Sequence, residues 1–266
     1  MSDLPFFPSN IWLFGFLVAA VLLAIAEGGY QLGLRLFSAK DEGRRSQIGG
    51  VQAAILGLLG LLLGFTFSMA VSRYEARRDL LLKEANCIGT TWLRASLLPE
   101  AQRAPVRELL LRFVRVRLET EKVSYDSGKL AEGLRRSAEI EKELWQQAEI
   151  AAKEAPTPIT ATFIVTLNEM IDTDAERVHA GRNRIPATVW VLLILVAACG
   201  CLTSAYGSGA QGARSAFTSA FLPLLISIVI FLIFDLRTSH QGMVSVSQEP
   251  MLDLEKMMQE QTGKTP

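Results

Sequence analysis

The sequence has 266 residues, of which 50% are hydrophobic and 20% are charged, and its formal net charge is zero. The charges are unevenly distributed, because 19 of the 27 lysines and arginines and 18 of the 27 aspartates and glutamates lie between Arg73 and Arg184. The flanking segments are strongly apolar, which is typical of a membrane protein with a charged middle domain. Since binding to nucleic acid requires a net basic surface, the balanced charge of the middle domain argues against nucleic acid as a partner.

The first apolar segment covers residues 11–26 and ends with small residues before Glu27, as a cleaved signal peptide would. The ten residues before it contain Asp3 and no lysine or arginine, which counts against a signal peptide, and apolar residues continue as far as Phe37. We therefore predict a retained first membrane span of about 20 to 25 residues. Glu27 then lies near the membrane interface, where a carboxylate either reaches the headgroups or serves a function.

Residues 48–98 contain no proline and predict one long helix. Its length would be roughly 75 Å, and a bilayer core of about 30 Å can cover less than half of it. The first half carries small residues three or four apart, a spacing that permits close helix packing in membranes: Gly49, Ala53, Gly57, Gly60, Gly64 and Ser68. The second half has a seven-residue hydrophobic repeat, typical of a helix packed on partner helices: Tyr74, Leu81, Ala85, Ile88, Trp92 and Ala95.

The charged middle domain is predicted to be a helical bundle, because no period-two alternation indicates a strand. Pro99 ends the long helix, and Pro105 suits the first turn of the next one. A turn at residues 126–128 precedes a helix whose predicted apolar face contains Leu130, Leu134, Ala138, Trp145, Ala148 and Ala152. The following helix has Phe163, Leu167, Ile171 and Val178 at helical spacing.

Two further spans, residues 187–206 and 216–234, make four in all, so the fold class is an all-α membrane protein with four transmembrane helices. The predicted divisions are residues 10–72 for the first two spans, 73–186 for the soluble helical domain, 187–236 for the last two spans and 237–266 for the tail. A short amphipathic helix in the tail, around residues 253–258, is expected to lie on the bundle.

An even number of spans places both termini and the soluble domain on one side of the membrane. Eight basic residues flank the spans on that side: Arg73, Arg77, Arg78, Lys83, Arg177, Arg182, Arg184 and Arg237. Five lie on the other side: Arg35, Lys40, Arg44, Arg45 and Arg214. Because basic residues concentrate on the cytoplasmic side, we predict a bacterial inner-membrane protein with both termini and the soluble domain in the cytoplasm.

Sites for chemistry are sparse. One helix face carries Glu169, Asp172, Glu176 and His179, and the last two have a spacing that metal-binding bundles use. The other histidine, His240, lies in the tail, and Arg177 and Arg182 are positioned to neutralise the carboxylates, so a solvated, salt-bridged face is the preferred interpretation. No phosphate-binding loop, nucleophile elbow or zinc cluster is present in the sequence, and Cys87, Cys199 and Cys201 form no disulfide framework. We expect no enzyme activity, no bound metal and no cofactor.

Residues 63–74 resemble the second membrane helix of bestrophins, in which a Gly-Phe pair, here Gly64 and Phe65, precedes a few apolar residues and an Arg-aromatic pair, here Arg73 and Tyr74. A likeness over most of the chain is to the bacterial bestrophin-like domain family, carried by residues 84–90, 97–100, 167–171, 183–186 and 246–250. Bestrophins are pentameric anion channels whose second helix lines a narrow apolar neck. The resemblance therefore implies a channel.

Carried over from that family, the neck positions fall on Gly57, Leu61 and Phe65, and Met69 and Ser72 continue the same pore-lining face. Gly57 departs from the pattern because it is too small to form a ring. The acidic run that binds calcium in animal bestrophins is absent after Asp235, so calcium gating is not expected. The alternative is that Leu61 and Phe65 pack in an oligomer or against the other spans.

The leading hypothesis is a homo-oligomeric membrane channel for small inorganic anions, either a tetramer or a pentamer, embedded in lipid. In this hypothesis Gly49, Ala53, Gly60, Gly64 and Ser68 pack against neighbouring helices. The alternative is a non-conducting membrane scaffold or sensor, in which the long helix relays a signal. The sequence does not distinguish the two, because both require a small-residue helix interface and a rigid extension.

Overall fold

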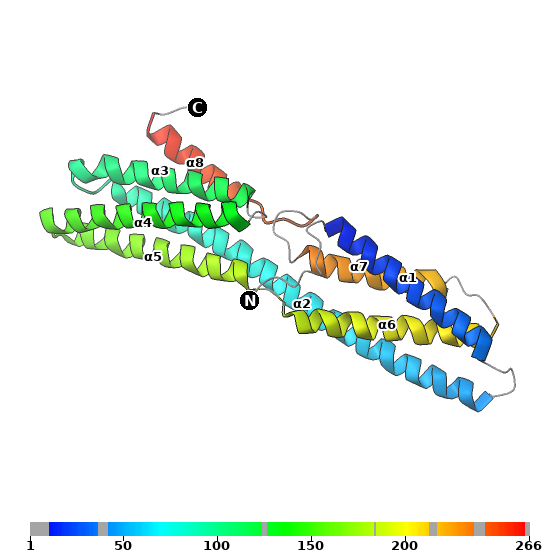
Figure 1. The fold of residues 1–266 in the computed structure, drawn as a ribbon. Coiled ribbons are helices and arrows are strands. Elements are labelled where there is room, and N and C mark those ends of the chain that lie inside the picture. The colour runs from blue at the N-terminus through cyan, green and yellow to red at the C-terminus, as the bar shows by residue number, and fades with distance from the viewer. Residues whose placement is uncertain are drawn as a thin grey trace. The chain divides into compact units, whose positions relative to one another are not determined.

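The computed structural model describes residues 11–36, 42–123, 127–183, 185–212, 217–236 and 243–263. Within these ranges the chain is helical and has no strand, which confirms the all-α prediction (Figure 1). The chain divides into two compact units. Unit 1 contains residues Met1–Arg73 and Arg184–Ser245, and unit 2 contains Tyr74–Asn183 and Val246–Pro266.

The long predicted helix is α2, which runs without interruption over the 54 residues Glu42–Ala95. It begins six residues before the predicted start at residue 48, because the polar residues 42–47 continue the helix instead of forming a connection. It ends three residues before the predicted end, where the amide of Ser96 donates to the carbonyl of Leu93 over 3.2 Å in a closing turn. The absence of proline from its interior allows this length.

Unit 1 is built from apolar helices: α1 (Ile11–Leu36), α6 (Ala187–Ala210), α7 (Leu222–Asp235) and the first part of α2. A π-helical turn, η1 (Phe217–Phe221), leads into α7. Among the described residues, three stretches are long and apolar enough to cross a membrane: Ile11–Leu36, Gln47–Ala95 and Pro158–Ala210. The apolar helix Ser219–Asp235 is shorter, so the predicted count of four spans stays a prediction.

The core of unit 1 contains aromatic side chains from α1, α6 and α7. The rings of Phe14 and Phe234 stack with their centroids 4.1 Å apart, and Trp190 meets both rings edge-on. All three side chains are buried. Such pairs stabilise beyond the area that they bury, so these contacts fix the ends of the three helices relative to one another.

Helices α1 and α6 approach each other closely at three glycines. A Cβ atom added to Gly29 would lie 2.6 Å from the carbonyl oxygen of Leu202, and one added to Gly33 would lie 2.4 Å from that of Tyr206. From the other side, a Cβ on Gly209 would lie 2.2 Å from the oxygen of Tyr30. Only glycine permits this separation of the two backbones.

Unit 2 is a helical bundle of α3 (Glu100–Lys122), α4 (Ser127–Glu154), α5 (Pro158–Arg182) and the second part of α2. Its core contains the seven-residue repeat of α2, with Leu81, Ala85, Ile88, Trp92 and Ala95 buried and Tyr74 partly buried. The repeat is therefore satisfied inside one chain. The tail helix α8 (Glu249–Gln261) buries Met251, Leu254 and Met258 in the same core, which confirms the predicted amphipathic helix on the bundle.

Two predictions in unit 2 were wrong in detail. Helix α3 begins at Glu100, so Pro105 lies inside the helix and not in its first turn. The core face of α4 is rotated from the predicted face, since Trp145 is 37% exposed and Ala138 is exposed. The residues of α4 that are buried are Gly133, Ser137, Ile140, Leu144, Ala148 and Ala151. Close approach of α3 selects this face, because a Cβ on Gly133 would lie 2.2 Å from Thr120 Oγ1.

Candidate pore-lining face

In unit 1 one side of α2 packs against the chain's own helices. Leu59 and Ala70 are buried in the unit 1 core, and Thr66 is buried with its hydroxyl donating to the carbonyl of Leu62 over 2.6 Å. The Gln52 amide donates to Ser204 Oγ on α6 over 3.1 Å. Leu56 lies against Gly200, where an added Cβ would meet Leu56 Cδ2 at 3.2 Å. These contacts define the inner side of the helix.

The predicted pore-lining residues are all exposed in the single chain, Met69 only at the lower limit. Leu61 is 55% exposed, Phe65 is 65% exposed and Met69 is 36% exposed, and Gly57 and Ser72 are exposed as well. Because successive members are three or four residues apart, they follow one side of the helix over about four turns. The alternative that Leu61 and Phe65 pack against the chain's own spans is therefore wrong.

The predicted helix-packing residues are also uncovered. Ala53 and Ser68 are exposed, and a Cβ added to Gly49, Gly60 or Gly64 would meet no atom within 4 Å. Among the described residues of unit 1, the glycines that closely approach the backbone of another helix lie instead between α1 and α6, at Gly29, Gly33 and Gly209. The spacing of Gly29 and Gly33, four residues apart, is a weak sequence signal for this contact. Packing of the α2 glycines against another subunit stays a prediction.

The polar residues singled out on α5 do not form a metal site. Glu169, Asp172, Glu176 and His179 are exposed, and the described residues contain no group of three or more histidines, cysteines, aspartates or glutamates that could hold a metal ion. The Asn168 amide donates to Asp172 over 2.8 Å, and Lys83 Nζ lies 2.7 Å from Glu176. His240 and Arg184 lie outside the described residues.

The remaining single residues have ordinary surroundings. Glu27 accepts a hydrogen bond from Gln31 over 3.2 Å, one turn along α1. The cysteines Cys87, Cys199 and Cys201 are free thiols. Asp235 is fully buried at the end of α7 and accepts hydrogen bonds from the amides of Met243 and Val244, both over 3.0 Å. The Asp235 carboxylate therefore links the end of α7 to the backbone at Met243 and Val244.

A buried ionic network in unit 2 was missed by the sequence analysis. Arg117 on α3 donates to both carboxylate oxygens of Glu84 on α2, over 2.7 and 3.2 Å, and both side chains are almost fully buried. The Nε atom of Arg117 also lies 3.3 Å from Asp174 Oδ1 on α5. Burial opposes the charge of Arg117, but the adjacent Glu84 carboxylate raises the pKa of the guanidinium above its ordinary value.

Arg177 on α5 extends this network and does not neutralise the exposed α5 face as predicted. Its Nη2 atom lies 3.3 Å from Asp174 Oδ1, and its Nη1 atom lies 3.9 Å from Glu121 Oε2. The Nε atom lies 3.2 Å from Glu84 Oε2, an ion-pair distance at which the N–H is not aligned for a hydrogen bond. Two guanidinium groups are therefore shared among three carboxylates inside the bundle.

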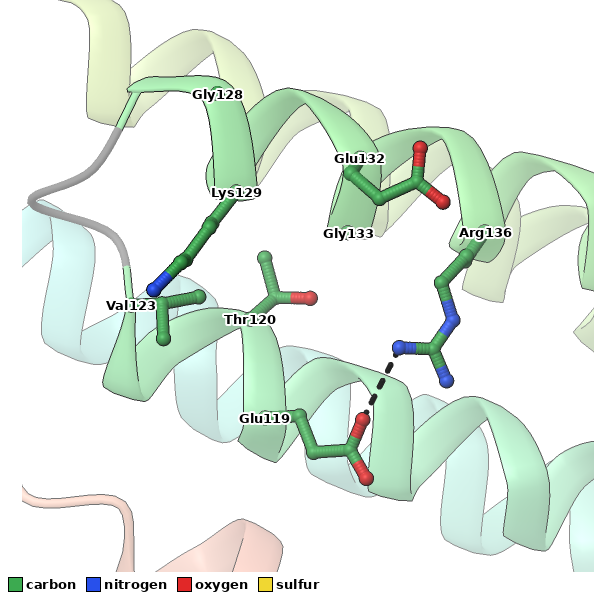
Figure 2. A pocket seen from close by; sticks show the side chains of 8 residues that line it. All are labelled: Glu119, Thr120, Val123, Gly128, Lys129, Glu132, Gly133 and Arg136. Atoms are coloured by element: carbon green, nitrogen blue, oxygen red, sulfur yellow. Dashed lines mark hydrogen bonds and ion pairs between the residues drawn. The ribbon is translucent and has the colours of Figure 1, made fainter.

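An open pocket of about 360 Å³ lies beside the start of α4. Figure 2 shows the residues that line it: Glu119, Thr120, Val123, Gly128, Lys129, Glu132, Gly133 and Arg136. Arg136 Nη1 lies 3.1 Å from Glu119 Oε2 across the pocket, and Glu132 receives hydrogen bonds from Arg135. Glu119 and Arg136 are thus paired with each other, and Glu132 is paired with Arg135, which does not line the pocket. We assign no ligand to this pocket.

The comparisons with known proteins agree with this architecture. A crystal structure of a membrane protein has a TM-score of 0.68 and 14% identity, with 94% of this chain and 98% of that chain covered. A bacterial bestrophin homologue from Klebsiella pneumoniae has a TM-score of 0.62 and 16% identity, with 96% and 98% covered. A tryptophan-to-alanine variant of that homologue has a TM-score of 0.63 and 16% identity, with 94% and 96% covered.

No curated protein matches the chain. The family model described as the bestrophin-like domain matches residues 11–251, which is nearly the whole chain. The chain therefore belongs to the bestrophin-like family.

Proposed function

We propose that this protein is a homo-oligomeric membrane channel for small inorganic anions, with the exposed face of α2 lining the pore. The observation that carries the proposal is the division of α2 in unit 1. One side packs in the chain's own core, while Leu61 and Phe65 are more than half exposed on the same helix. Membership in the bestrophin-like family supports a channel and not an enzyme.

Leu61 and Phe65 would form the neck of this channel. In a ring of subunits each position is repeated around the symmetry axis, so the two residues give adjacent apolar rings, one helical turn apart. Such a constriction gates ions by excluding water. Gly57 adds no side chain to the ring, whereas Met69 and Ser72 extend the same face toward the end of the span.

The proposed topology has four spans, with both termini and unit 2 in the cytoplasm of a bacterium and the spans in its inner membrane. The fourth span would be the stretch Ser219–Asp235, whose roughly 17 residues are near the lower limit for crossing a bilayer core. The excess of basic residues flanking the spans on the unit 2 side supports this orientation. The predicted divisions at residues 10–72, 73–186, 187–236 and 237–266 follow from it.

The experiment that tests the proposal is anion flux into liposomes containing the purified protein, recorded under an anion gradient at several protein densities. Replacing Phe65 by alanine should raise the basal flux, because a smaller side chain keeps the constriction wet. Its melting temperature should stay near that of the wild type, since Phe65 is 65% exposed within the chain. Phe16→Ala is the matched control: Phe16 is 75% exposed on α1, and its loss should leave the flux unchanged.

Two results would count against the channel. A Phe65→Ala protein with a lowered melting temperature and no gain in flux would place Phe65 in a packed interface between subunits. Absence of flux from the wild type and from the variant at every protein density would favour the non-conducting scaffold or sensor. If cations pass selectively, the protein is a channel but the proposal that it conducts anions is wrong.

A further inference from the structure

Helix α4 brings one more carboxyl to the buried ionic network of unit 2. The Glu141 side chain is partly buried, and its Oε1 atom is fully shielded without a hydrogen-bond partner among the described residues. Ser137, one turn earlier on the same face, is 1% exposed, and its hydroxyl likewise has no partner there. Burial of an ionised carboxylate without a hydrogen bond is costly, so this position favours the neutral acid.

The charged groups that face Glu141 come from the three other helices of the bundle. They are Glu84 on α2, Arg117 on α3, and Asp174 and Arg177 on α5. Arg177 also lies 3.9 Å from Glu121 on α3. Both guanidinium groups are already engaged with Glu84 and Asp174. Ionised Glu141 would therefore be a fourth carboxylate beside two guanidinium groups.

The balance of these effects favours a bound proton on Glu141. Burial, together with the Asp174 carboxylate, raises the pKa of Glu141 to about 8, and the attraction of Arg117 offsets only part of the rise. A glutamate in an unfolded chain has a pKa of about 4.3. Between these two values the folded protein keeps a proton that the unfolded chain has released.

We propose that Glu141 is a proton-binding group inside the unit 2 bundle, protonated at neutral pH, and that loss of its proton in mildly alkaline solution loosens α4 from α3 and α5. Proton binding gives a role to the Glu141 carboxyl, which is not part of the described ion pairs of the network. Proton binding at Glu141 does not depend on ion conduction, because the groups involved lie in unit 2 alone.

Infrared difference spectroscopy of the full chain in detergent, between pH 6 and pH 9, tests for the proton directly. The wild type should lose the carbonyl stretch of a protonated carboxyl group as the pH rises, and Glu141→Gln should lack this change. Glu149→Gln removes an exposed glutamate of the same helix and should behave as the wild type. Absence of the band from the wild type at pH 6, or its persistence in Glu141→Gln, would overturn the proposal.

Stability against pH tests the consequence. Because the folded pKa is raised, the contribution of Glu141 to stability is fully present below about pH 4.3, decreases up to about pH 8 and is level above it. The melting temperature of the wild type should therefore fall relative to that of Glu141→Gln across this window. At pH 9 the amides of α4 should exchange hydrogen faster in the wild type than in the variant, with equal rates at pH 6.

A constant difference in melting temperature between the two proteins from pH 5 to pH 9, or equal exchange at pH 9, would show that ionisation does not loosen α4. If Glu141→Gln does not fold, Glu141→Met replaces it in all three measurements, since it also removes the titrating group. If the amides of α4 exchange hydrogen no faster in the wild type than in Glu141→Met at pH 9, the proposal is contradicted in the same way.

Discussion

At the scale of single residues, Arg117 and Glu84 form an ion pair that is buried in unit 2. Both side chains are almost fully buried. Among the described residues, Arg117 alone donates two hydrogen bonds to Glu84. Replacing Arg117 by methionine leaves Glu84 buried, with Arg177 as its remaining cationic partner among the described residues. Because removing one partner leaves a buried charge poorly compensated, we expect a loss of about 3 to 5 kcal/mol, measured by denaturation of the full chain in detergent.

Two controls separate charge from packing in this experiment. Arg135→Met breaks an exposed network on α4 with Glu132 and Glu139, and it should leave the melting temperature unchanged. The double variant Glu84→Met with Arg117→Met removes both buried charges and should recover most of the loss. A double variant as unstable as Arg117→Met would mean that the pair acts through shape and not through charge.

The sequence contained part of the information about this network. Glu84 lies beside Leu81, Ala85 and Ile88 of the hydrophobic repeat, and a charge at such a position indicates burial with a partner. The identity of that partner could not be predicted, because Arg117 is 33 residues away and meets Glu84 only through the packing of α3 on α2. Glu141 was hidden for the same reason: its neighbours come from three other helices.

At the scale of elements, the close contact of α1 with α6 predicts opposite behaviour for two adjacent glycines. Gly29→Ala places a Cβ 2.6 Å from the Leu202 carbonyl oxygen and must push the helices apart, whereas a Cβ on Gly28 meets no atom within 4 Å. Overpacking of this kind typically costs about 1 to 3 kcal/mol. The melting temperature of Gly29→Ala should fall, and that of Gly28→Ala should not. Equal melting temperatures would contradict the close contact.

The types of the elements could be predicted from periodicity, while some of their faces could not. The length of α2 follows from the absence of proline, and the tail helix follows from its amphipathic pattern. On α4 the larger apolar side chains, including Leu134 and Trp145, predicted one face, but the bundle buries a neighbouring face that contains Gly133 and Ser137. Which face of a helix is buried depends on the distance between its backbone and that of its neighbour. The hydrophobic pattern of a single helix does not contain that distance.

At the scale of the whole molecule, the exposed side of α2 in unit 1 requires a cover from outside the single chain. Both the pore-lining residues and the small residues on α2 are uncovered in the single chain. Lipid could cover either surface, because lipid tails are as apolar as leucine. The small-residue spacing favours helices, since it permits a close backbone contact that lipid does not exploit. A ring of copies places one of these surfaces at a subunit boundary and the other toward the axis.

The last prediction is therefore that the chain is a homo-oligomer with α2 at the subunit contact. The mass in mild detergent should be four or five times the 29.2 kDa of one chain. In a variant without Cys87, Cys199 and Cys201, Ser68→Cys should form oxidant-dependent crosslinks between chains, because Ser68 lies on the small-residue side of α2. The control is Thr66→Cys, since Thr66 is 3% exposed and its side chain lies in the unit 1 core. A monomer mass, with no more crosslinking at residue 68 than at residue 66, would remove the pore, because one copy of α2 cannot enclose one.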